Sequence, residues 1–156
     1  MALTKLDQLY RAVILDHSKN PRHRGVLDQA TTQIELNNPT CGDVIQIQLL
    51  VEDGIVKDAR FEGSGCTIAM SSASMMTEAI IGKTEAEALK LAADFSQVVQ
   101  GKAVENEEAL GDAMMLSGVS KFPARIKCAT LSWKALEIAL QDKDNQGTAG
   151  QLKHDE

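Results

Sequence analysis

The chain has 156 residues, of which 44% are hydrophobic and 24% charged, a size and balance that exclude a long disordered chain, a collagen-like protein and a coiled-coil rod. Its 16 Lys and Arg against 22 Asp and Glu give a formal charge of −6, which argues against a general binder of nucleic-acid phosphates. No apolar run reaches the roughly 18 residues of a membrane-spanning helix and the polar N-terminus does not resemble a signal peptide, so we expect a cytoplasmic protein with no membrane or nucleic-acid partner.

The first thirty residues predict one helix and then a loop. Residues 3–17 place leucine, tyrosine, valine and isoleucine at helical spacing, the pattern of an amphipathic helix. Residues 18–30 contain Ser, Asn, Pro and Gly, which break this periodicity and indicate a surface loop. We expect His17 and His23, near this loop, to belong to a solvated basic surface.

A change to period-two alternation predicts an antiparallel sheet in the next segment. Residues 32–37 and 44–52 are the first two strands, and the second carries isoleucine, leucine and valine on one face and glutamine on the other. Asp53-Gly54 is a strong hairpin signal, because both turn positions favour residues that tolerate positive φ. The alternation continues over residues 55–61, so the sequence predicts a meander of three strands.

The second half of the chain predicts helices. Apolar residues return to helical spacing after Gly63-Ser64-Gly65 and continue to Ile80. Thr84 and Glu87 form a capping-box pattern for a helix that ends near Val99. The last three segments are a shorter helix over 107–116, a connection over 118–122, and a final helix that begins at Pro123 and ends near Gln141.

This order of elements predicts an α+β fold. Helices would cover one face of a small three-stranded antiparallel sheet, with an N-terminal helix and a long C-terminal helix. We expect residues 1–142 to form a single domain. Residues 143–156 lack apolar periodicity, and we expect them to be a disordered, frayed tail.

Cys41, Cys66 and Cys128 are the candidate functional residues. They form no CxxC pair, and an odd number of cysteines in a chain without a secretion signal favours thiols over disulfides. Cys41 and Asp43 flank Gly42 in a short turn between two strands, so both side chains can project from one loop. Cys66 lies at the start of a helix, where unpaired N–H groups and the helix dipole favour a thiolate.

Cys128 lies one turn into the final helix, with Arg125 three residues earlier on the same side. A cation there would stabilise negative charge, although a lone helical cysteine is usually a small core residue, and that interpretation stays open. Together the three thiols and Asp43 supply three sulfurs and one oxygen, a donor set that suits tetrahedral zinc. The two histidines near the first loop are alternative ligands.

Three separated segments, in this order, resemble the U-type iron–sulfur cluster assembly proteins, which are IscU-like and NifU N-terminal-like, and within them the SufU branch. The resemblance covers residues 1–142. It implies an α+β fold with a three-stranded antiparallel sheet, a zinc site formed by Cys41, Asp43, Cys66 and Cys128, and acceptance of sulfur from a cysteine desulfurase. The segments are Asn-Pro-Thr-Cys-Gly-Asp at 38–43, Phe-Glu-Gly-Ser-Gly-Cys-Thr-Ile-Ala-Met-Ser-Ser-Ala-Ser at 61–74, and Phe-Pro-Ala-Arg-Ile-Lys-Cys at 122–128.

Two departures separate the chain from the scaffold branch typified by IscU. That branch has a histidine immediately before the third cysteine, where this chain has Lys127. Its chaperone-binding segment Leu-Pro-Pro-Val-Lys is replaced by Lys-Phe-Pro-Ala-Arg at 121–125. The stretch over 100–121 is similar to the additional segment of the SufU branch. All three features favour that branch.

The resemblance implies a zinc-dependent, sulfurtransferase-like relay that takes persulfide sulfur from a SufS-type cysteine desulfurase and works with downstream iron–sulfur assembly proteins. We expect Cys41 to accept the sulfur, because it lies on a short loop beside Asp43, the weakest of the expected ligands. Arg125 would be the supporting cation. The alternative is a scaffold on which a transient iron–sulfur cluster is assembled with the same thiolates. A third interpretation is a zinc-stapled interaction domain without sulfur chemistry.

Overall fold

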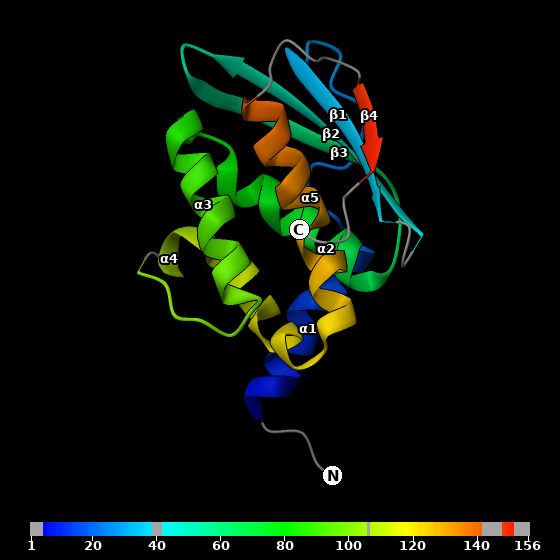
Figure 1. Cartoon of the computed structure of the whole chain (residues 1–156), viewed down its shortest axis with the longest axis vertical. Helices are drawn as coiled ribbons and strands as arrows, with labels where there is room; N and C mark the ends of the chain where they lie inside the picture. The colour runs from blue at the N-terminus through cyan, green and yellow to red at the C-terminus, as the bar shows by residue number, and fades with distance from the viewer. Residues whose placement is uncertain (1–4, 39–41, 106, 142–147, 152–156) are drawn as a thin grey trace.

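A computed structural model of the chain describes residues 5–38, 42–105, 107–141 and 148–151. Figure 1 shows a twisted sheet on one side of the molecule and helices packed against one of its faces, so the predicted α+β fold is confirmed. None of the helices within these ranges is both long and apolar enough to cross a membrane. The elements are α1 (Lys5–Lys19), β1 (Thr32–Asn38), β2 (Asp43–Glu52), β3 (Ile55–Ser64), α2 (Thr67–Ile80), α3 (Glu85–Val98), α4 (Glu107–Leu110), the 3-10 helix η1 (Gly111–Lys121), α5 (Pro123–Gln141) and β4 (Thr148–Gln151).

The sheet has the strand order β3-β2-β1-β4. The first three strands form the predicted antiparallel meander, in which Asn38 pairs with Asp43 and Val44 with Ser64. Residues 148–151, within the predicted tail, form the fourth strand and pair in parallel with β1, while the rest of that tail lies outside the described residues. The free edge of β1 offers unpaired N–H and C=O groups to any extended segment. This pairing uses backbone groups and needs no apolar pattern, so local sequence does not predict it.

Two glycines allow β3 to run alongside β2. The hairpin at Asp53 and Gly54 has φ values of 56° and 74°, which are those of the predicted tight turn. Gly63 has φ +139°, and a Cβ there would lie 2.0 Å from the carbonyl oxygen of Val44. Only glycine at position 63 therefore allows β3 to continue beside β2 as far as Ser64, beyond the predicted end at Phe61. This longer strand brings the start of α2 close to the first residue of β2.

The core lies between the sheet and the helices α2, α3 and α5. Phe95 of α3 and Trp133 of α5 stack with ring centroids 4.5 Å apart. On the opposite face of the sheet the loop after α1 covers Gln48, which is 2% exposed and accepts a hydrogen bond from the backbone N–H of Leu27 at 2.6 Å. The loop therefore lies against the sheet. The buried sheet residues are Ile34, Leu36, Ile45, Ile47, Leu49, Val56, Ala59 and Phe61.

The helices α2, α3 and α5 lie where the sequence predicts them, but the segment between α3 and α5 differs. The capping box at Thr84 and Glu87 is confirmed by reciprocal hydrogen bonds of 2.9 and 3.1 Å. The predicted helix over 107–116 ends as an α-helix at Leu110 and continues as η1. Gly111 has φ +57°, a left-handed conformation that interrupts α-helical hydrogen bonding.

Candidate metal centre

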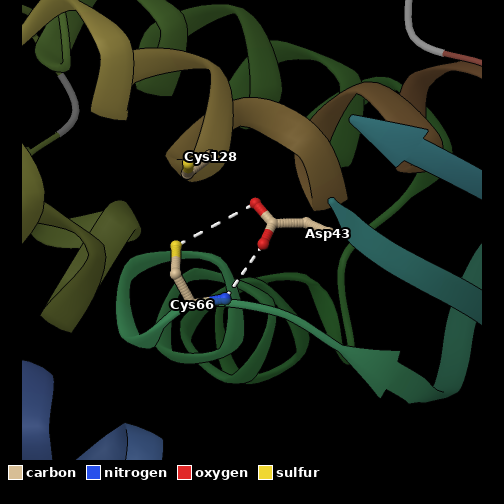
Figure 2. Close-up of side chains that lie close together, drawn as sticks. All are labelled: Asp43, Cys66 and Cys128. Atoms are coloured by element: carbon tan, nitrogen blue, oxygen red, sulfur yellow. Dashed lines mark hydrogen bonds between the residues drawn. The ribbon is translucent and has the colours of Figure 1, made fainter. Parts of the chain in front are cut away.

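Three of the four predicted ligands converge at one end of the sheet. Asp43 is the first residue of β2, Cys66 immediately precedes α2, and Cys128 lies in the second turn of α5 (Figure 2). One carboxylate oxygen and the two sulfurs all lie within 4.8 Å of one another. Asp43 and Cys128 are 1% and 0% exposed, and Cys66 is half-buried. The fold therefore brings three distant metal-ligating groups to one place.

Asp43 and Cys66 are held together by hydrogen bonds. The backbone N–H of Cys66 donates to Oδ1 of Asp43 at 2.9 Å, and the Cys66 thiol lies 3.9 Å from Oδ2 (Figure 2). Cys66 is the N-cap residue of α2, and its sulfur accepts the N–H of Ala69 at 3.5 Å. As predicted, this thiol faces the positive end of a helix dipole, which stabilises a thiolate.

Gly65 leaves the room that the Asp43 side chain needs. A Cβ at position 65 would lie 2.7 Å from Oδ1, 3.0 Å from Cγ and 3.1 Å from Cβ of Asp43. These contacts are closer than van der Waals packing allows, and the carboxyl group is short and buried. Gly65 is thus part of the centre. The sequence alone identifies it only as part of the Gly63-Ser64-Gly65 segment that precedes a helix.

Gly65→Ala should weaken metal binding. The added methyl group must displace the carboxylate and break its bond with the Cys66 N–H, a steric cost of about 1–3 kcal/mol. We expect roughly a tenfold or greater loss of zinc affinity by chelator competition. Gly118→Ala is the matched control, because a Cβ there meets nothing within 4 Å. Equal zinc affinity in the two variants would contradict this role of Gly65.

A buried hydrogen-bond relay joins the helix that follows Cys66 to the helix that carries Cys128. The Ser72 hydroxyl of α2 donates to the carbonyl of Ala129 at 2.5 Å and accepts the indole N–H of Trp133 at 3.1 Å. Ala129 directly follows Cys128. Ser72 therefore fixes α5 against α2 beside the centre. Ser72 is one of three serines in α2, and no local pattern in the sequence distinguishes it from Ser71 and Ser74.

Ser72→Ala should destabilise the fold by about 1–3 kcal/mol, because it leaves a buried indole N–H and a carbonyl without this partner. Ser132→Ala is the control, since the Ser132 hydroxyl is also buried but has no hydrogen-bond partner within the described residues. Urea unfolding measures both free energies. Equal destabilisation by the two substitutions would show that the relay contributes little.

Positive charge lies beside the two thiols. Arg125 is exposed, and its pKa lies above the ordinary value, first because of electrostatic attraction to Cys66 and then through hydrogen bonding and attraction to Cys128. This agrees with the placement of Arg125 and Cys128 on the same side of the helix. Lys127 is half-buried in the same turn of α5.

The remaining predicted residues have different outcomes. Cys41 lies outside the residues that the structure describes, so its ligand and acceptor roles stay predictions. The prediction of a solvated surface at His17 is wrong, because His17 is 0% exposed and belongs to a separate cluster with Glu78 and Asp112. His23 is half-buried, with Nδ1 3.1 Å from the Thr77 hydroxyl. The loop packs onto α2, and this packing is invisible in local sequence composition.

A groove of about 950 Å³ opens next to the centre. It runs between α1, the start of α2, η1 and the start of α5, and Phe122 on its wall is 62% exposed. Arg11, Lys121 and Arg125 line it, and the described lining includes no acidic residue. The groove is therefore apolar and positively charged, in a chain whose formal charge is −6.

Comparison with known proteins assigns the family. The model of the NifU-like N terminal domain matches residues 9–146. The chain belongs to this family. The family resemblance seen in the three sequence segments is thereby confirmed.

Two relatives within the family carry different names. The chain is 58% identical over 132 residues to the zinc-dependent sulfurtransferase SufU of Bacillus subtilis, covering 85% of this chain and 89% of that protein. It is 51% identical over 145 residues to the iron–sulfur cluster assembly scaffold protein IscU of Streptococcus pyogenes, covering 93% and 91%.

A crystal structure from Fervidobacterium islandicum AW-1, named as a candidate scaffold protein of the SUF system, shares the fold. It is 38% identical and superposes with a TM-score of 0.78, covering 82% of this chain and 93% of that one.

Proposed function

We propose that this protein is a zinc-dependent sulfurtransferase that takes persulfide sulfur from a SufS-type cysteine desulfurase for iron–sulfur cluster assembly. The observation that carries the proposal is the convergence of Asp43, Cys66 and Cys128 in a buried centre. Support comes from the 58% identity to a protein named as a zinc-dependent sulfurtransferase. Downstream iron–sulfur assembly proteins would receive the sulfur.

The donor set fits zinc, with Cys41, Asp43, Cys66 and Cys128 as the proposed ligands. Two sulfurs and a carboxylate oxygen within 4.8 Å of one another match a tetrahedral site that lacks one ligand. Cys41 is two residues from Asp43, so their Cα atoms lie within about 7.6 Å of each other. Bound zinc would keep the thiols deprotonated and would offset their charge.

Cys41 is the proposed acceptor, because it belongs to the connection between β1 and β2, two residues before Asp43. Cys128, by contrast, is fully buried. Its thiolate would attack the terminal sulfur of the desulfurase persulfide. A new S–S bond forms on Cys41, the S–S bond of the desulfurase breaks, and the electron pair of that bond leaves with the desulfurase thiolate. The exchange needs no external oxidant or reductant.

Positive side chains around the groove would guide this encounter. A persulfide is anionic, and Arg11, Lys121 and Arg125 provide the positive field that attracts an anion to the centre. Arg125 also interacts electrostatically with both Cys66 and Cys128. We infer that the desulfurase approaches from this side of the molecule.

Desulfurase turnover is the direct test. A purified SufS-type enzyme with cysteine as substrate should release sulfide faster when this protein is added with one zinc bound. Mass spectrometry after omission of the final reductant should find one added sulfur, about 32 Da, on the peptide that contains Cys41. Absence of stimulation together with absence of the persulfide on any cysteine would refute the proposal.

The second candidate is a scaffold for an iron–sulfur cluster, which the 51% identity to a protein named IscU favours. Thiolates that suit zinc also suit iron–sulfur clusters. Colourless purified protein with about one zinc per chain would favour the transferase. A visible absorption band, and transfer of the intact cluster to an apo-acceptor, would favour the scaffold.

Zinc removal should also lower the stability of the fold. The proposed ligands come from β2, α2, α5 and the β1–β2 connection, so one ion closes long stretches of chain. At a free zinc concentration about a thousandfold above its Kd, binding adds about 4 kcal/mol to the free energy of unfolding. In a chain of this size, losing that contribution lowers Tm by on the order of 10 °C. Calorimetry before and after chelation measures it, and zinc add-back is the control. An unchanged Tm after verified zinc loss would show that zinc does not hold the fold.

A further inference from the structure

A second group of metal-ligating side chains lies at the junction of α1, α2 and η1. Nε2 of His17 is 2.9 Å from Oδ2 of Asp112 and 3.7 Å from Oε1 of Glu78. The three ligand atoms lie within 4.8 Å of one another. His17 is completely buried, while the side chains of Glu78 and Asp112 are 43% and 48% exposed. A buried imidazole thus faces two carboxylates that solvent can reach.

We propose that His17, Glu78 and Asp112 form a second metal site, which binds a divalent first-row transition ion. The site is separate from the cysteine centre and shares no residue with it. It would join α1, α2 and η1, three segments that are far apart in the sequence. It would therefore fix η1 against the first two helices.

The hydrogen bonds of the ring orient it for this role. Nδ1 of His17 lies 2.7 Å from the Ser74 hydroxyl oxygen, which also accepts the backbone N–H of Arg22 at 2.8 Å. Metal-bound histidines characteristically bond a fixed partner through their other ring nitrogen. In the tautomer whose ring proton is on Nδ1 and donates to Ser74, the Nε2 lone pair faces the two carboxylates and is available to bind a metal ion.

The distances suit a metal ion. Donor atoms at about 2.0–2.2 Å from one ion, at octahedral to tetrahedral angles, lie roughly 2.9–3.4 Å apart. The Nε2 to Asp112 distance is already in this range, and the half-exposed Glu78 side chain needs only a small movement. A hollow of about 380 Å³, lined by both carboxylates, gives access from solvent.

The charges also suit a divalent ion. Two carboxylates and a neutral imidazole are balanced by a charge of +2. Arg22 lies near both carboxylates, but its guanidinium donates to Asp16 at 2.7 Å and to the Asn20 carbonyl at 3.1 Å. One imidazole with two carboxylates suits Zn²⁺, Fe²⁺, Co²⁺ or Mn²⁺, while Ca²⁺ and Mg²⁺ prefer oxygen ligands alone.

Cobalt titration of the full-length protein, loaded with a single equivalent of zinc so that only the cysteine centre is filled, tests this site. Zn²⁺ binds more tightly than Co²⁺, so the cysteine centre keeps its zinc. Equilibrium dialysis should then find about one cobalt ion per chain, without the intense near-ultraviolet charge-transfer band of cobalt thiolates. With a second equivalent of diamagnetic Zn²⁺ in place of cobalt, ring ¹⁵N NMR should show a ligation shift at Nε2 of His17.

Isosteric amides provide the matched variants. Asp112→Asn and Glu78→Gln should each weaken cobalt binding by at least about tenfold without loss of the zinc in the cysteine centre. Glu108→Gln is the control, because it removes a carboxylate from the same hollow that does not belong to the triad. Circular dichroism checks that all three variants are folded.

Three outcomes would overturn the proposal. They are the absence of a second bound ion, a second ion that both amide variants retain, and a thiolate charge-transfer band. The first would leave His17 as a hydrogen-bond partner of Asp112 and nothing more. None of them bears on sulfur transfer at the cysteine centre, so this site and the proposed function succeed or fail separately.

Discussion

Replacing Cys66 or Cys128 with alanine is expected to abolish both zinc binding and stimulation of the desulfurase. Cys128 is fully buried within α5 and Cys66 is fixed at the N-cap of α2. We expect no neighbouring side chain to replace the lost thiol at either position. A two-sulfur site binds zinc much less tightly than a three-sulfur site. We expect the bound metal to fall from about one zinc per chain to near none.

Cys41→Ala should abolish stimulation for an additional reason. It removes one proposed ligand and also the proposed sulfur acceptor. At a zinc concentration that restores full occupancy, Cys41→Ala should still give no stimulation and no persulfide. Cys66→Ser and Cys128→Ser, which keep a weaker oxygen ligand, should regain part of their activity under the same zinc loading.

Metal analysis and sulfide release, measured on the same samples, separate these effects. Normal stimulation by any one of the three alanine variants would contradict the ligand assignment. Persulfide on Cys66 in a zinc-loaded Cys41→Ala protein would show that the protein still accepts sulfur, but that Cys66 and not Cys41 is the acceptor. Lys127→Ala provides a control in the same turn of α5 as Cys128, because it changes charge without removing a ligand.

Asp43→Cys is expected to hold zinc more tightly and yet to transfer sulfur far more slowly. It would give the site four sulfurs, a closed set with a high affinity for zinc. In the proposed mechanism, sulfur transfer requires the Cys41 thiolate to be released, and the carboxylate would be the weakest of the four proposed ligands. Turnover at full zinc loading measures the effect. Transfer at the unsubstituted rate with tightly held zinc would show that the site need not open.

Two further substitutions at this position separate its roles. Asp43 accepts the Cys66 N–H at 2.9 Å, so Asp43→Ala removes a hydrogen bond as well as a ligand. Asp43→Asn can keep that acceptor while it removes the negative charge. Both should retain the fold and bind zinc moderately less tightly, because three sulfurs remain and water can fill the vacant position. At full zinc loading, a greater loss of transfer in Asp43→Ala would reveal the contribution of the hydrogen bond.

Local sequence patterns were sufficient for most helices and for the first three strands, but not for η1 or β4. The alternation in β2, the Asp53-Gly54 turn and the Thr84–Glu87 capping box all depend on contacts between near neighbours. Such contacts form in the same way in any fold that contains the segment. The interrupted helix at Gly111 was missed, because an apolar pattern over 107–116 does not reveal where one glycine adopts a left-handed conformation.

The sequence by itself determined the α+β class, the antiparallel meander, the family and the candidate ligands Cys41, Asp43, Cys66 and Cys128. Tertiary structure alone decided that the last three of these meet, that Gly65 makes room for Asp43, and that Ser72 fixes α5 against α2. It also decided that His17 is buried beside two carboxylates. The physical reason is separation along the chain: these contacts join residues tens of positions apart, and their geometry depends on how whole helices pack on the sheet, which no local pattern encodes.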